Sequence, residues 1–205
     1  MTLTLYTNPM SRGRIARWML EEVGAEYETI VLDYASTMKA EPFVSINPMG
    51  KVPTIVHDGQ TVTECAAICA YLAEAFPHAD LAPHPDERAA YYRWLFYAAG
   101  PVEAATANRA LSVVPTESQE RMVGYGNFDT MVAVLEQAVG AHDYIAGDNF
   151  TAADVYVGSQ VIWGQQFDWL PKRDVFAAYA ERLTKRPAYI RAAALDDALI
   201  PVVKA

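Results

Sequence analysis

The sequence has few cysteines, no run of basic residues and no long apolar stretch. Its 205 residues include only two cysteines, Cys65 and Cys69, and carry a formal net charge of −9. The acidic balance argues against general nucleic-acid binding and against adsorption to an anionic membrane, because no basic run is available to neutralise phosphates. No apolar stretch approaches the roughly 20 residues of a membrane-spanning helix. We therefore expect neither a nucleic-acid partner nor a membrane partner.

Other absences bear on location, metals and redox chemistry. The N-terminus lacks the basic flank and apolar core of a signal peptide, which together with the few cysteines predicts a cytoplasmic protein. The histidines have no metal-ligand spacing, so no metal site is expected; they are His57, His78, His84 and His142. No C-x-x-C pair follows the first predicted strand, which argues against a dithiol oxidoreductase.

Strand and helix patterns alternate in the first part of the chain, up to residue 77. The β-α-β order at its start predicts a parallel strand pair with a crossover helix. Strands are expected over 2–7, 26–32, 52–56 and 60–63, and helices over 11–24 and 64–76. Residues 1–77 are therefore expected to form an α/β domain, and the pattern changes after them.

Beyond residue 77 the strand patterns disappear. Residues 78–85 are rich in proline, histidine and aspartate and have no periodicity, which predicts an interdomain linker. Residues 86–205 read as an all-helical domain. Its amphipathic stretches fall at about 86–110, 117–140, 152–166, 174–185 and 187–197. At the start of the stretch over 152–166, Thr151 and Asp154 have the spacing of a helix-capping box, which is a structural motif.

Three short stretches have the chemistry of a binding site, and each also has a plain structural interpretation. Pro53 begins a strand and can leave the backbone N–H and C=O of Val52 free for an extended ligand, or it is an ordinary edge proline. Glu64 stands at a helix start, where free amides attract a carboxylate and Glu64 itself can hold an ammonium group, or it is there for capping. Ser11, in the other strand-to-helix junction, is either functional or a helix cap.

Taken together, these stretches resemble the cytosolic glutathione transferase superfamily over essentially the whole chain. The matching segments are LYT…S…R…LEE, FVSINPMGKVPTIVHDG, TECAAICAYLAEAFP and TAADV. The resemblance, which is to bacterial-type members with a serine-type active site, implies a thioredoxin-like N-terminal domain, an all-α C-terminal domain and usually a homodimer. It also implies a cis peptide bond before Pro53, an uncommon feature of folded proteins.

The resemblance assigns glutathione-binding roles to particular residues. The Val52 backbone would pair with the cysteinyl part of glutathione, next to Pro53. Glu64 would hold the γ-glutamyl ammonium, and the Cys65 N–H would hold the γ-glutamyl carboxylate. The lysines at positions 51 and 39 match positions that meet the glycyl carboxylate, Lys51 more closely than Lys39. Glutathione is thus the expected co-substrate, with no metal.

Activation of the glutathione thiol is the expected chemistry. A free thiol has a pKa of roughly 8.5, and only its thiolate is a good nucleophile. By the resemblance Ser11 is the catalytic hydroxyl, which would donate a hydrogen bond to the sulfur and lower its pKa. Tyr6 ranks second because it lies nearer the strand than the usual catalytic tyrosine. Arg12 and the nearby helix N-terminus would add positive potential.

The second substrate is expected in an apolar cleft between the domains. Tyr97, Glu103, Asn108 and Trp163, with Arg12, are candidates to line it, although ordinary packing or exposure is an alternative for each. The sequence WLFYAAGPVEAATANR is the expected wall, and its Gly100–Pro101 pair predicts a kink or break in a helix.

Three function classes follow from the resemblance. The favoured one is a glutathione transferase that attacks small, mostly apolar electrophiles in detoxification. The second is a glutathione-dependent peroxidase or disulfide reductase on the same scaffold. The third, a non-catalytic binding module, is disfavoured by the near-complete set of glutathione-contact positions. Cys65 occupies a position where many members have serine, whereas Cys69 is expected to be a small buried residue.

Overall fold

The computed structural model describes residues 2–200, and the chain divides into two compact units. The sheet unit takes in the chain up to Leu81 together with the chain from Lys185 onward. The helical unit runs from Ala82 to Thr184. The domain boundaries expected from the sequence, 1–77, 78–85 and 86–205, stay predictions about independently folding parts.

A four-stranded mixed sheet organises the sheet unit, in the strand order β2-β1-β3-β4. β1 (Leu3–Thr7) pairs in parallel with β2 (Glu28–Val31) and antiparallel with β3 (Thr54–His57). β4 (Gln60–Val62) forms a hairpin with β3. All four expected strands are present, and the parallel β1–β2 pair confirms the predicted β-α-β unit.

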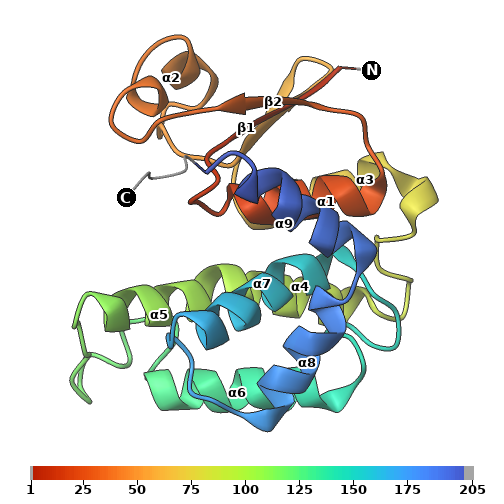
Figure 1. Ribbon diagram of the computed structural model, residues 1–205. Coiled ribbons are helices and arrows are strands. Elements are labelled where there is room, and N and C mark those ends of the chain that lie inside the picture. The colour runs from red at the N-terminus through yellow and green to blue at the C-terminus, as the bar shows by residue number, and fades with distance from the viewer. Residues whose placement is uncertain (1, 201–205) are drawn as a thin grey trace. The chain divides into compact units, whose positions relative to one another are not determined.

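Helices cover both faces of this sheet (Figure 1). α1 (Gly13–Val23) and α3 (Cys65–Ala75) lie on one face, and α2 (Phe43–Ile46) lies on the other. Successive side chains of β1 point to opposite faces of the sheet. Tyr6 packs against the apolar cluster on the α2 side, so Leu5 points to the face covered by α1 and α3. Short 3-10 helices follow at η1 (Thr37–Lys39) and η2 (Pro77–Ala79).

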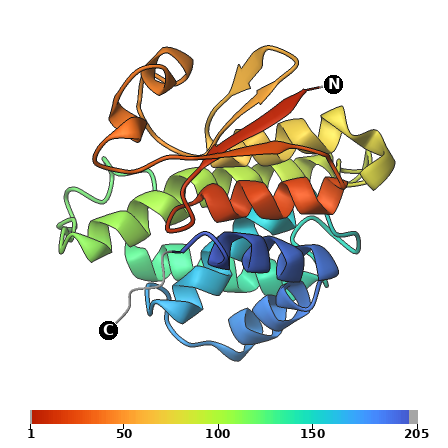
Figure 2. The same ribbon diagram turned by 45° about the horizontal axis from the view of Figure 1, so that its top comes forward.

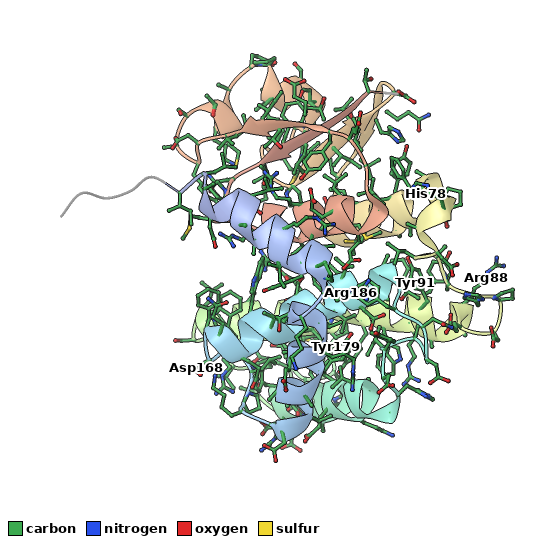
Figure 3. All side chains as sticks on the ribbon, turned by 45° about the vertical axis from the view of Figure 1, so that its right-hand side comes forward. His78, Arg88, Tyr91, Asp168, Tyr179 and Arg186 are labelled. Carbon is green, nitrogen blue, oxygen red and sulfur yellow. The ribbon has the colours of Figure 1, made fainter. Side chains whose placement is uncertain are left out.

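The last helix, α9 (Pro187–Asp197), belongs to the sheet unit and packs beside α1. Figures 1 and 2 show these two helices side by side. Arg186, labelled in Figure 3, precedes α9, and its Nε and Nη2 donate to the Glu22 carboxylate of α1 at 2.7 and 2.8 Å. The sequence predicted the helix itself and grouped it with the helical domain.

The helical unit forms no strand within residues 82–184 beyond an isolated bridge between Tyr144 and Gly147. Its helices are α4 (Arg88–Tyr97), the π-helical η3 (Ala98–Val102), α5 (Glu103–Ala110), α6 (Phe128–Ala141), α7 (Ala152–Gln166) and α8 (Asp174–Thr184). Among residues 2–200, no helix is both long and apolar enough to cross a membrane. The expected pairing of an α/β domain with a helical one is therefore confirmed.

Of the two outcomes predicted for the Gly100–Pro101 pair, a break in the helix does not occur, because η3 carries the chain from α4 directly into α5. The pair lies instead in a π-helical segment, the kind of irregularity at which helices kink. A wider π-helical turn suits proline, which has no amide proton for the regular helical ladder. The helix expected from residue 117 begins only at Phe128, where the Asn127 side chain caps it by accepting from the Thr130 N–H at 2.9 Å.

Candidate functional site

The loop between β1 and α1 holds Ser11. Its hydroxyl donates to the Asn8 carbonyl at 2.7 Å and accepts from the Gly13 N–H at 2.9 Å. α1 begins at Gly13 with Arg12 in the capping position, so Ser11, the predicted cap, lies one residue before the observed cap. Its hydroxyl nevertheless accepts from the first amide of the helix. Because its proton is already engaged, the hydroxyl must turn from the Asn8 carbonyl before it can donate to a ligand.

Tyr6 stands at the end of β1 but has a different environment. Its ring lies 5.4 Å from the Phe43 ring and packs against an apolar cluster of Leu32, Met38 and Phe43. Val52 packs against the same cluster. The ring is thus part of the α2 layer of the sheet, and the rank of Tyr6 as the second candidate hydroxyl stays a prediction.

The segment before β3 exposes one stretch of unpaired backbone. The Val52–Pro53 peptide bond is cis, as predicted. Val52 lies outside the strands and is half-buried, and within residues 2–200 its amide and carbonyl have no hydrogen-bond partner. An extended ligand therefore finds one free donor and one free acceptor at this residue.

The buried side chain of Asn47 holds this segment by hydrogen bonds. This residue was not singled out from the sequence. It is buried, and its Nδ2 donates to the Lys51 carbonyl at 2.9 Å and to Thr54 Oγ1 at 3.0 Å. Its Oδ1 accepts from the Met49 N–H at 3.1 Å. The sequence signal was the Asn-Pro pair, which marks a turn but does not indicate that the amide is buried. A second cis bond, between Glu41 and Pro42, was also not anticipated.

The N-terminus of α3 carries Glu64 and Cys65. Glu64 is exposed, with a φ of 63°, and Ile68 N–H makes the first helical bond to its carbonyl. The amides before Ile68 have no partner within the helix and lie at its positive end. Cys65 is buried, and its Sγ contacts the Arg12 carbonyl at 3.7 Å. That contact brings the start of α3 against the Ser11 loop.

Cys69 is fully buried one turn further along α3. Its hydrogen bond with Cys65 and its burial raise the pKa of the Cys69 thiol well above the ordinary value. Both cysteines are free thiols. Cys69 thus has the character of a small apolar core residue, as the sequence predicted.

The two candidate lysines differ in their surroundings. Lys39, at the end of η1, donates a hydrogen bond from Nζ to the Gly50 carbonyl. This bond places Lys39 beside the segment that leads to Val52. Lys51 is exposed within that segment. Lys39 is also exposed, so the two lysines differ in that the Lys39 ammonium has the Gly50 carbonyl as a partner, whereas Lys51 directly precedes Val52 in the chain.

The candidates of the helical unit have partners of their own. Tyr97 donates to the Met131 carbonyl at 2.9 Å, and burial raises its pKa to about 12. Asn108 donates to the Tyr125 hydroxyl at 2.9 Å, and Glu103 accepts from Gln160 at 3.4 Å. Trp163 is half-buried in α7. That these four line a substrate cleft stays a prediction.

The arrangement in the sheet unit fits an organic ligand with charged ends and an extended backbone. It offers a helix N-terminus, a nearby carboxylate, a free backbone pair, lysines and a hydroxyl. Within residues 2–200 no group of three or more histidine, cysteine, aspartate or glutamate side chains is placed to hold a metal ion.

Comparisons with known proteins identify the relatives of the chain. Residues 1–74 match the family model "Glutathione S-transferase, N-terminal domain". "Glutathione S-transferase F13" of Arabidopsis thaliana is 31% identical over 211 residues, covering 93% of this chain and 94% of the relative. "Glutathione S-transferase GST-4.5" of Xanthomonas campestris is 28% identical over 177 residues, covering 80% and 83%.

Solved structures agree in fold over nearly the whole length. A sphingomonad glutathione S-transferase complexed with glutathione is 26% identical, with a TM-score of 0.76 over 95% of this chain and 98% of that one. A glutathione transferase from Methylococcus capsulatus is 25% identical, with a TM-score of 0.78 over 97% and 100%.

Proposed function

Because the chain belongs to the cytosolic glutathione transferase superfamily, we propose that it activates the thiol of glutathione for attack on small, mostly apolar electrophiles. The observation that carries the proposal is the contact of Cys65 Sγ with the Arg12 carbonyl, because it joins the start of α3 to the Ser11 loop. Relatives named glutathione S-transferase support a transferase-type function, and the glutathione complex of the sphingomonad protein supports glutathione binding.

In the proposed complex each end of glutathione meets a different element. The γ-glutamyl carboxylate binds the free amides from Cys65 onward, and Glu64 binds the adjacent ammonium. The cysteinyl part pairs with the Val52 amide and carbonyl, which Pro53 follows. The glycyl carboxylate lies nearest Lys51, while Lys39 holds the intervening segment through Gly50.

Ser11 is the proposed donor to the sulfur, and Tyr6 is second. A hydroxyl that donates a hydrogen bond to the thiolate stabilises the charged form and lowers the pKa of the thiol. Each unit by which the pKa falls corresponds to about 1.4 kcal/mol of preferential stabilisation of the thiolate. Arg12 adds positive potential in the same loop. The remaining parts of the proposal rest on the family alone: a cytoplasmic homodimer active in detoxification, with the second substrate near Tyr97, Glu103, Asn108 and Trp163.

Substitution of Ser11 tests the thiol-activation part. Ser11→Ala is expected to raise the pKa of bound glutathione by about one unit and to lower conjugation rates about tenfold near neutral pH. Ser45→Ala is the matched control, since its hydroxyl donates to Glu41 at 2.6 Å on the surface of the same unit. Should Ser11→Ala behave like this control while Tyr6→Phe raises the pKa, the catalytic role belongs to Tyr6.

A turnover panel tests the reaction class. With glutathione present, the purified protein is assayed on a chloronitroaromatic compound, an organic hydroperoxide and hydroxyethyl disulfide. The proposal expects conjugation of the aromatic compound to be the fastest of the three. Faster turnover of the hydroperoxide or the disulfide would instead indicate a peroxidase or a reductase. If glutathione left the melting temperature unchanged, the proposed glutathione-binding site would be contradicted, because a ligand of the folded state stabilises it.

A further inference from the structure

Backbone carbonyls of the loop that carries Ser11 are all engaged. Leu32 N–H donates to the Thr7 carbonyl at 2.8 Å, and Ser11 N–H donates to the Asn8 carbonyl at 3.1 Å. The Arg14 Nε donates to the Pro9 carbonyl at 2.7 Å, and the Tyr34 hydroxyl donates to the Met10 carbonyl at 3.2 Å. The loop is thus fixed along its length before any ligand arrives.

Asn8 holds this loop with both ends of its side-chain amide. Its Oδ1 accepts from the Met10 N–H at 2.9 Å, which closes a tight turn inside the loop. Its Nδ2 donates at 2.8 Å to the carbonyl of Leu32, a buried residue just beyond β2. The backbone carbonyl of Asn8 also accepts the hydrogen bond from the Ser11 hydroxyl. Asn8 therefore links the position of Ser11 to the sheet.

We propose that Asn8 is the positioning residue for the Ser11 hydroxyl, an inference that rests on the proposed role of Ser11 toward the glutathione sulfur. Gly13 N–H keeps Ser11 Oγ in place, while the proton of the hydroxyl rests on the neutral Asn8 carbonyl. When the thiol of bound glutathione ionises and releases its proton to solvent, the Ser11 hydroxyl rotates, keeps its own proton and donates a hydrogen bond to the thiolate instead of to that carbonyl. The exchange is favourable because hydrogen bonds to charged acceptors are roughly twice as strong as neutral ones.

The side chain of Asn8 matters for this exchange although it does not touch the sulfur. Without it, the Met10 N–H and the Leu32 carbonyl lose their partners, and the turn before Ser11 is no longer tied to β2. The hydroxyl then samples positions from which it donates poorly to the sulfur. Binding of glutathione depends instead on Val52, Glu64 and Cys65, so affinity for glutathione should change much less than the ionisation of its thiol.

Asn8→Ala tests the inference against a matched asparagine. We expect the pKa of bound glutathione, measured by ultraviolet absorbance of the thiolate, to rise by about one unit and kcat near neutral pH to fall about tenfold. The KM for glutathione should stay within about twofold. Asn127→Ala is the control: Asn127 also accepts a nearby N–H and donates to Glu120, but in the helical unit. It should lower stability by about 1 kcal/mol and leave the thiol pKa unchanged.

A double-mutant cycle separates this inference from the proposed function. If Asn8 acts through Ser11, Asn8→Ala adds nothing to the thiol pKa once Ser11→Ala is present. An equal effect in both backgrounds overturns the inference, and so does an Asn8→Ala variant that loses only stability while Ser11→Ala raises the pKa. If Ser11→Ala itself leaves the pKa unchanged, the proposed role of Ser11 fails and the inference falls with it.

Discussion

At the scale of single residues, Cys65 is a position at which the chain differs from many members of the family. Many members have serine at the start of this helix, whereas a thiol is a weak hydrogen-bond donor. The Sγ of Cys65 is directed at the Arg12 carbonyl, at a distance of 3.7 Å. The helix amides remain available for a carboxylate, but the side chain contributes little to holding it.

Replacing this thiol by a hydroxyl should strengthen glutathione binding. Cys65→Ser supplies a stronger donor at the γ-glutamyl carboxylate, worth about 1 kcal/mol or roughly fivefold in Kd by calorimetry. Cys69→Ser is the control, because it places a hydroxyl at a fully buried position and should lower stability without tightening the ligand. Unchanged or weaker binding by Cys65→Ser would contradict the assignment of this position.

At the scale of elements, the junction of β1 and α1 depends on a close approach at Gly13. A Cβ at this position would lie 1.9 Å from Thr7 Oγ1 and 2.9 Å from Ser11 Oγ. The absence of a side chain lets the Gly13 amide reach the Ser11 hydroxyl. The strand, the loop and the helix are therefore packed too closely here for any other residue.

Gly13→Ala should consequently damage both folding and activity. Overpacking of this kind costs about 1 to 3 kcal/mol, readable in urea unfolding, and displacement of Ser11 should lower kcat. Gly124→Ala is the matched control, since nothing lies within 4 Å of its added Cβ. If the two variants had equal stability and equal turnover, the close packing at Gly13 would be shown to be unnecessary for folding and activity.

The start of α7 is a second junction, built around the buried carboxylate of Asp154. It accepts from Ile145 N–H at 2.7 Å, from Thr151 N–H at 2.9 Å and from the Tyr179 hydroxyl of α8 at 2.8 Å. Tyr179 is labelled in Figure 3. The bond from Thr151 N–H confirms the predicted capping role. Burial raises the pKa of Asp154 to about 6, although these hydrogen bonds oppose the rise.

This raised pKa predicts a pH-dependent contribution to stability. Its value of about 6 lies above the ordinary 3.8, so the contribution of Asp154 is full below about pH 4 and is lost as pH rises through about 6. Asp154→Asn should therefore destabilise the protein more at about pH 4.5 than at about pH 7.5, by about 2 kcal/mol in urea unfolding. Asp129→Asn, at an exposed position of α6, should show no such difference.

At the scale of the whole chain, ion pairs tie its C-terminal part to its N-terminal part. Arg17 of α1 donates to Asp196 of α9 at 2.9 Å, and both side chains are buried. Arg14 pairs with the neighbouring Asp197, which is far more exposed. Since these residues lie about as far apart in sequence as the chain allows, α9 completes the unit that carries the proposed glutathione site.

The two adjacent aspartates should differ sharply in their effect on stability. Asp196→Ala leaves the Arg17 guanidinium buried without its counter-charge, which typically costs about 3 to 5 kcal/mol. Asp197→Ala removes a carboxylate that is 62% exposed and should cost no more than about 1 kcal/mol. Urea unfolding of both variants measures the difference. Similar losses of stability would show that the buried ion pair contributes no more than the exposed one.

Much of the fold was predictable because its signals are local. The alternation in β1, the glycine that ends α1 with a φ of 66° and the Thr151 cap of α7 each depend on neighbouring residues alone. Ser11, Val52 and Glu64 were recognisable because motifs fix their places at strand ends and a helix start. The delayed start of α6 was missed because residues 117–122 are mostly good helix formers, such as glutamate, glutamine, arginine and methionine, although they form no helix here.

By itself, the sequence determined the order of the elements, the family and the positions of the residues proposed to bind glutathione. Tertiary structure alone decided that the Ser11 hydroxyl rests on Asn8, that Cys65 contacts the Arg12 carbonyl and that Arg17 is buried against Asp196. The physical reason is that hydrogen bonds and burial depend on groups far apart in the chain, which local patterns do not encode.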